Sequence, residues 1–153
     1  MTPPSRPSRT RLAFSAVSLA LPLGATVVAR WAWGSEIPRQ IGTRWSSPGG
    51  ADRSSEESEV FVGALAVMIC ALVAGCVILA VPALSAMVTR ITLLALGGVA
   101  AGAATQWLIP THLTMVAGHW SDAVLGAWIL VHFASWAYGL VPMLIAPPVR
   151  AAR

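Results

Sequence analysis

The fold is decided by one polar stretch, residues 34–59, which reads GSEIPRQIGTRWSSPGGADRSSEESE. It lies between long runs of residues that are almost uncharged. A run of roughly 20 apolar residues is long enough to cross the hydrocarbon core of a bilayer as a helix. We therefore expect residues 34–59 to form an aqueous loop between membrane-spanning helices.

The composition argues against a soluble domain. Of the 153 residues, 56% are hydrophobic and 10% are charged, and the mean hydropathy is +0.72, whereas soluble domains contain about 25% charged residues. The net charge of +4 comes from arginines in tails and loops, without a basic helix face, which argues against a nucleic-acid partner. Cys70 and Cys76 lie in one apolar run and are interpreted as small packing residues.

The apolar runs predict an all-α fold, a membrane-embedded four-helix bundle over residues 12–146. The four spans are expected at residues 12–33, 60–81, 91–109 and 122–145. Residues 1–11, rich in Pro, Ser and Thr, are expected to form a disordered tail, and residues 147–153 a second tail.

The first span has an alternative interpretation, a cleaved secretory signal peptide. Arg6, Arg9 and Arg11 resemble the basic start of such a peptide. The apolar run that follows is longer than the usual 7–15 residues, so we expect the span to be retained.

The arginines near the span ends predict the orientation. If the N-terminus is cytoplasmic, three arginines lie outside, all within residues 34–59, and a larger group lies inside, namely Arg6, Arg9, Arg11, Arg90, Arg150 and Arg153. Cytoplasmic segments carry the excess of basic residues in membrane proteins. We therefore expect a multi-pass plasma-membrane protein with both termini in the cytoplasm.

Two spans carry signals for a helix start. Ser54 followed by Glu57 matches the capping-box pattern, which predicts that this pair begins the second span. Asp122 would place a negative charge at the start of the fourth span, where the helix dipole favours it.

The third span is rich in small residues and predicts close helix packing. Gly98 and Gly102 form a GxxxG pair, which lets two helix backbones approach closely in lipid. We expect the second span as the partner, and a dimer or a foreign subunit as the alternatives. Gln106 continues the same spacing, so its amide is expected to face protein rather than lipid.

His132 is the most suggestive candidate for chemistry, because an ionisable group within a span is a functional hypothesis by default. Trp128, His132 and Trp136 recur every four residues and would form one stripe on a helix. The stripe could face a ligand or handle protons. Alternatively, a neutral imidazole could share a hydrogen bond with Thr105 or Gln106 on the next helix.

A second group of candidates lies before the fourth span. His112, His119 and Asp122 include ligand types that bind Zn²⁺, but their spacing matches no zinc signature. A haem held between spans would need a second histidine at membrane depth. Because motifs for nucleotide binding or serine hydrolysis are also missing from the sequence, we expect no metal, no cofactor and no enzyme.

The loop contains the motif Pro-x-x-Ile-x-Thr-x-Trp-x-x-x-Gly-x-x-Asp, formed by Pro38, Ile41, Thr43, Trp45, Gly49 and Asp52. This motif resembles the signature of a bacterial membrane domain of unknown function, DUF sixteen-forty-eight, which forms the N-terminal part of SdpI-like immunity proteins. The likeness covers about the first half of the chain. The chain has Arg44 and Ser54 where the family usually has histidine and an aromatic residue.

Two classes of function follow from these patterns. The resemblance implies a binding or interaction protein that protects against a membrane-active toxin or relays its presence to a cytoplasmic regulator. The alternative is an accessory structural subunit of a larger membrane complex, in contact with another membrane protein or a second copy through the Gly98–Gly102 face. A transporter or membrane enzyme that uses His132 is the third possibility.

Overall fold

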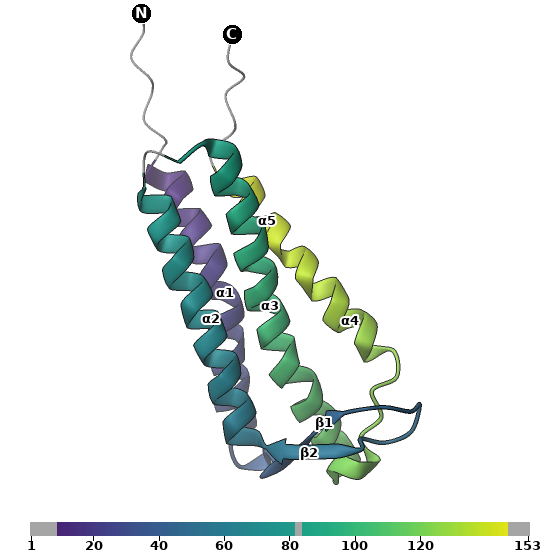
Figure 1. Ribbon diagram of the computed structural model, residues 1–153. Coiled ribbons are helices and arrows are strands. Elements are labelled where there is room, and N and C mark those ends of the chain that lie inside the picture. Colours follow the sequence, from purple (N-terminus) through teal and green to yellow (C-terminus); the bar gives the residue numbers. More distant parts are fainter. Residues whose placement is uncertain (1–8, 82–83, 147–153) are drawn as a thin grey trace, which may run out of the picture.

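Four long helical segments run side by side in the computed structural model, which describes residues 9–81 and 84–146 (Figure 1). The first three are single helices, and the fourth is divided by a short 3₁₀ turn. Their bounds are α1 Arg9–Trp33, α2 Glu57–Ala80, α3 Ala86–Ala117, and then α4 Trp128–Ser135, η3 Trp136–Gly139 and α5 Leu140–Ile145. All four segments are long and apolar enough to cross a membrane, which confirms the predicted number of spans.

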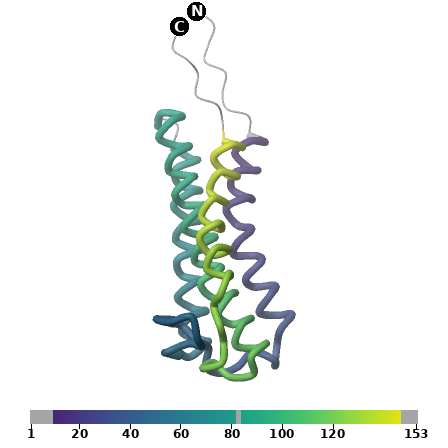
Figure 2. Tube along the Cα trace, turned by 90° about the vertical axis from the view of Figure 1, so that its right-hand side faces the viewer, coloured from purple at the N-terminus to yellow at the C-terminus, as the bar shows by residue number. Residues whose placement is uncertain are grey.

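The two ends of the bundle differ. One end carries a β-hairpin, formed by β1 (Gln40–Arg44) and β2 (Arg53–Glu56), together with the 3₁₀ turns η1 (Gly34–Glu36) and η2 (Trp120–Asp122). We call it the hairpin end. At the opposite end, α5 packs against the first part of α1 (Figure 2). The predicted tails, residues 1–11 and 147–153, lie outside the described residues, except that residues 9–11 begin α1.

The hairpin is a departure from the all-α prediction. β1 and β2 pair antiparallel, with Ile41 opposite Ser55 and Gly42 opposite Ser54, and the register is irregular between Gly42 and Arg44. Ile41 is fully buried, and the Gly42 amide donates to Thr114 Oγ1 of α3 at 3.2 Å. Strands this short leave only a weak alternating pattern in the sequence. The hairpin is held by the end of α3.

The predicted boundaries around Pro110 were wrong. The helix α3 continues through Pro110 to Ala117 and ends at Gly118, whose φ of 78° is the left-handed cap conformation. A proline removes one helical hydrogen bond, but Ile109, Thr111 and other residues around it are buried against neighbouring elements, which stabilises the continued helix. The predicted loop at residues 110–121 is therefore largely helical.

The predicted starts of the second and fourth spans were also wrong. Asp122 lies in η2, and the helical part of the fourth span begins only at Trp128. Ser54 lies in β2, where its hydroxyl donates to Gln40 Oε1 at 3.4 Å, so it does not cap α2. The N-cap position of α2 is Glu56, whose side chain makes no capping hydrogen bond.

Gly98 and Gly102 of α3 pack against the fourth segment, and not against α2 as expected, although Ala100 and Ala104 of the same helix do lie in a cluster with Ala64 and Ala71 of α2. A Cβ at Gly98 would lie 2.9 Å from the carbonyl oxygen of Trp136, and one at Gly102 would lie 2.9 Å from the Trp136 ring. Gln106 is exposed, so no other helix of the described residues covers its amide, and the prediction that it faces protein now requires a second chain. Because a helix turns about 100° per residue, positions eight apart differ by about 80°, which rotates Gln106 off the Gly98 face.

The main core cluster lies toward the hairpin end and joins α1, α2, α3 and β1 there. Trp107 of α3 and Ile41 of β1 are both fully buried in it, together with Met68 of α2. A smaller cluster around Leu19 and Leu93 lies farther from the hairpin. The larger cluster fixes the ends of α1 and α2 relative to the hairpin, and it positions the site described next.

Candidate functional site

A buried ion pair joins the first two helices at the hairpin end. Arg30 lies in the last turn of α1, Glu57 is the first residue of α2, and Arg30 Nη1 donates to Glu57 Oε1. The Glu57 side chain is 7% exposed and that of Arg30 is 36% exposed. The indole Nε1 of Trp107 donates to the same carboxylate oxygen at 2.8 Å. Three helices thus meet at one carboxylate.

Aromatic rings surround this ion pair. The Arg30 guanidinium lies 4.0 Å from the centroid of the Phe61 ring, in cation–π geometry. The Trp107 ring is 5.1 Å from Phe61 and 5.5 Å from Trp33, measured between centroids. A buried ion pair contributes little net stability, because desolvation of both charges offsets their attraction. Its presence between apolar helices therefore makes this pair the candidate site.

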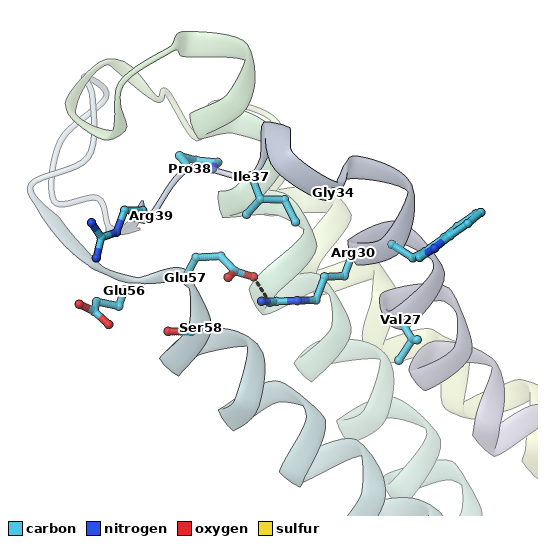
Figure 3. A pocket seen from close by; sticks show the side chains of 10 residues that line it. Val27, Arg30, Gly34, Ile37, Pro38, Arg39, Glu56, Glu57 and Ser58 are labelled. Carbon is cyan, nitrogen blue, oxygen red and sulfur yellow. Dashed lines mark hydrogen bonds and ion pairs between the residues drawn. The ribbon is translucent and has the colours of Figure 1, made fainter.

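The ion pair forms part of the wall of an open pocket of about 630 Å³ (Figure 3). The pocket lies between the end of α1, the start of α2 and the segment leading into β1. Its lining residues are Val27, Arg30, Trp31, Gly34, Ile37, Pro38, Arg39, Glu56, Glu57 and Ser58. The volume is in the range of about 300–1,000 Å³ that is usual for small-molecule sites.

The pocket holds a second pair of opposite charges, Arg39 and Glu56, on exposed side chains. Within residues 9–81 and 84–146, Arg30 and Glu57 form the only ion pair, so Arg39 and Glu56 are not paired with each other or with another charged group there. The pocket therefore has a formal charge near zero and one unpaired charge of each sign.

The motif residues of the loop stabilise the hairpin beside this pocket. Ile41 is buried in the core, and Trp45 Nε1 donates to the carbonyl oxygen of Ala123 at 2.7 Å. Thr43 Oγ1 lies 3.3 Å from Ser55 Oγ on the partner strand. Of the motif residues, Pro38 alone lines the pocket. The motif thus folds the loop, and the charges that face the pocket come mainly from residues outside the motif.

The two glycines of the loop have different surroundings. A Cβ at Gly49 would make only ordinary contact, 3.6 Å from Ser47 Oγ. Gly50 forms a β-bridge with Val124 and lies directly against the backbone of Ser121. Neither glycine has a positive φ, so the close backbone approach at Gly50, and not a left-handed turn, requires the glycine.

Asp52 closes the turn between the strands. Its Oδ2 accepts hydrogen bonds from the hydroxyl of Ser46, at 2.6 Å, and from the Ser46 backbone amide. The hydrogen bond from the Ser46 hydroxyl has the largest effect on the pKa of Asp52, and together with that from the amide it lowers this pKa below its ordinary value. The nearby charge of Arg44 lowers the pKa further. Asp52 forms no ion pair with Arg44 or Arg53 in the described residues.

His132 lies in a small network of hydroxyl groups. Its Nδ1 is 2.9 Å from Thr105 Oγ1 of α3, which is also 3.1 Å from Ser135 Oγ. Ser135 Oγ donates to the carbonyl oxygen of His132 at 2.6 Å. The predicted hydrogen bond to Thr105 is present, whereas Gln106 is not a partner.

The tryptophans of the expected stripe have separate surroundings. Trp136 packs on Gly102, and Trp128 contacts the ring of His112 edge to face, with the centroids 5.7 Å apart. His112 also stacks on Trp33 at 6.3 Å. These contacts account for Trp128, Trp136 and His112 as packing residues.

The other candidate ligands are dispersed. His119 Nδ1 lies 2.8 Å from Ser121 Oγ, which donates to Asp122 Oδ1 at 3.1 Å. His112 lies apart from them in α3, between two tryptophans. In the part of the chain that the structure describes, no three His, Cys, Asp or Glu side chains come together as metal ligands would.

Comparisons with models of known protein families, with curated proteins and with solved structures give no match to this chain. The function is therefore argued from the site. Sequence reasoning missed the pairing of Arg30 with Glu57 and the pocket around it. The available signal was Arg30 itself, the only charged residue inside the first apolar run.

Proposed function

We propose that this chain is a multi-pass plasma-membrane protein that acts by binding a ligand at the extracytoplasmic surface, without catalysing a reaction. In this arrangement the hairpin end faces outward and both termini face the cytoplasm. The excess of arginines at the opposite end of the helices supports this orientation. The exposed Trp31, near the hairpin end of α1, fits an aromatic residue at the membrane interface.

The observation that carries the proposal is the charged pocket. The ion pair between Arg30 and Glu57 adds little stability. It does hold a guanidinium in a fixed position in the wall of an accessible pocket. Fixed charges around a concave surface give orientation and specificity to a bound ligand.

The resemblance to SdpI-like immunity proteins gives this binding a biological setting. We propose that the chain protects the cell against a membrane-active toxin. Its ligand is then either the toxin itself or the membrane component that the toxin attacks. The hairpin supports this setting because Trp45 and Gly50 hold it against the segment before the fourth span. It therefore presents a rigid rim beside the pocket.

Site-specific photocrosslinking in native membranes tests the proposal. A photoreactive residue at Ser58, which lines the pocket, is compared with one at Glu59, an exposed neighbour that does not line it. A bound ligand gives a discrete adduct by mass spectrometry from position 58 and little from position 59. Equal labelling from both positions, or none from either, contradicts a binding pocket.

A second candidate function, accessory subunit of a membrane complex, is favoured by Gln106. Its amide is exposed on a helix that is apolar enough to span a membrane. An amide facing hydrocarbon is costly unless another protein supplies a hydrogen bond. This proposal predicts a stable complex after solubilisation in mild detergent, dissociated by Gln106→Leu and retained by Ala95→Leu on an exposed part of the same helix. A monomeric wild-type particle rules it out.

A further inference from the structure

We propose that the pocket binds a phosphoethanolamine group, a phosphate beside a primary ammonium, and that the source is the headgroup of a membrane lipid. This inference rests on the binding function proposed above and specifies the ligand class. The pocket, its two pairs of charges and its position on α1 each contribute to it.

The balance of charges favours a zwitterion. Arg30 is neutralised in part by Glu57, while Arg39 and Glu56 remain unpaired among the described residues and face the same pocket (Figure 3). An anion without an ammonium would meet two carboxylates, and a cation without a phosphate would meet two guanidinium groups. A ligand that carries both charges can satisfy Arg39 and Glu56 together.

Two guanidinium groups are available to the phosphate. Arg39 offers a planar guanidinium, which suits phosphate geometry, and the Arg30 side chain, 36% exposed, also lines the pocket. The first backbone amide of α2, that of Glu57, already donates to the carbonyl oxygen of Arg39 at 3.0 Å. The unpaired Arg39 is therefore the main phosphate donor.

The ammonium is expected to be primary because its acceptors are oxygen atoms. Glu56 and Ser58 both line the pocket and are exposed. A primary ammonium donates hydrogen bonds to a carboxylate and a hydroxyl, each strengthened by the charge. A quaternary ammonium has no N–H to donate and is recognised by aromatic cages instead. The pocket therefore favours ethanolamine over choline.

The position of the pocket favours a lipid over a soluble compound. Val27 and Trp31 form its rim on α1, at exposures of 47% and 84%, and both belong to a segment apolar enough to span a membrane. Arg39 and Glu56 lie beyond the ends of α1 and α2, on the hairpin side. The pocket thus changes from apolar to charged along the helix axis, as a lipid does from acyl chain to headgroup.

Native mass spectrometry of the full chain in detergent tests this inference. Phosphatidylethanolamine, phosphatidylcholine and phosphatidylglycerol with identical acyl chains are added in turn. We expect phosphatidylethanolamine to bind about tenfold more tightly than either other lipid, the factor that the loss of one charge-assisted hydrogen bond gives. Water-soluble O-phosphoethanolamine at the same concentration is expected not to displace it. Displacement by the soluble compound overturns the lipid source.

Matched variants locate the binding. Arg39→Gln should weaken the binding of all three lipids about tenfold, because each carries a phosphate, and Glu56→Gln should remove the preference for phosphatidylethanolamine. Arg53→Gln and Glu59→Gln, also exposed but outside the pocket, should retain both affinity and preference. All four changes are on the surface, and circular dichroism verifies that each variant remains helical. Equal binding of the three lipids, or equal effects of pocket and control variants, indicates lipid around the helices and overturns the inference.

Failure of this inference is distinguishable from failure of the proposed function. A peptide adduct crosslinked at Ser58, combined with no preference for phosphatidylethanolamine, overturns the lipid headgroup and preserves a binding pocket. Absence of any specific adduct at Ser58 together with no lipid preference overturns both.

Discussion

Replacement of Arg30 by methionine tests whether the ion pair is as buried as its geometry indicates. The change keeps an unbranched apolar side chain on α1 but leaves the Glu57 carboxylate, 7% exposed, without its cation. Removal of one partner of a buried ion pair costs about 3–5 kcal/mol. Because Arg30 is 36% exposed and water screens the pair, we expect Arg30→Met to cost about 2–3 kcal/mol.

The opposite change, Glu57→Gln, should cost less, about 1 kcal/mol. The amide oxygen of glutamine still accepts the hydrogen bond from Trp107, and Arg30 can turn its guanidinium toward water through its exposed part. The double variant Arg30→Met with Glu57→Gln contains no buried charge. We expect it to lie within about 1 kcal/mol of Glu57→Gln, so the two changes should be non-additive by at least about 1 kcal/mol.

The assay is reversible unfolding in mixed micelles with increasing sodium dodecyl sulfate, followed by circular dichroism and by tryptophan fluorescence, to which the buried Trp107 contributes. The midpoints of the four proteins give the double-mutant cycle. Additive losses refute the buried pair. An equal or larger loss from Glu57→Gln than from Arg30→Met refutes the assigned asymmetry of burial.

Two further predictions use other parts of the structure. Gly98→Ala should destabilise the chain by about 1–3 kcal/mol, because the added Cβ would lie 2.9 Å from the Trp136 carbonyl oxygen. Gly63→Ala, with open space around it, should be neutral or stabilising. Equal effects of the two changes in the same unfolding assay contradict this packing. The lowered pKa of Asp52 means that its contribution to the turn is complete above the ordinary pKa of about 3.9 and is lost as the pH falls through the lowered value. Hydrogen exchange of the Ser46 amide should therefore lose protection in acid, and Asp52→Asn should remove that pH dependence; an unchanged pH profile in the variant shows that another group is responsible.

The number of helices could be predicted from the sequence because span length is a local property. Each apolar run is long enough to cross a bilayer whatever it packs against. The helix boundaries were less predictable because they depend on contacts between distant residues. Pro110 looks like a stop signal, yet Thr111 and Thr114 beyond it are buried and the helix continues. The hairpin likewise depends on Thr114, which accepts a hydrogen bond from Gly42.

The site was less predictable than the fold because it forms only after the chain reverses direction. Arg30 and Glu57 are 27 residues apart, and the intervening segment must return before they can pair. In the sequence Glu57 resembles Glu56 and Glu59, all of them acidic residues at a helix start. The register that places Gln40 opposite Glu56, together with the Trp107 indole, makes Glu57 the one that turns inward. No single stretch of sequence determines that register.

The sequence contains one signal for a contact between helices, a proline in the first span and a tyrosine in the fourth, and backbone chemistry explains it. Proline has no N–H, so Pro22 in α1 leaves the carbonyl oxygen of Ser18 without its helical donor. The hydroxyl of Tyr138, in the fourth segment, donates to that oxygen at 2.6 Å. A freed carbonyl and a phenol would each be costly in an apolar layer, and each satisfies the other here. A proline in one span and a lone tyrosine in another are therefore a candidate contact pair, and in this chain they join α1 to the fourth segment well away from the pocket.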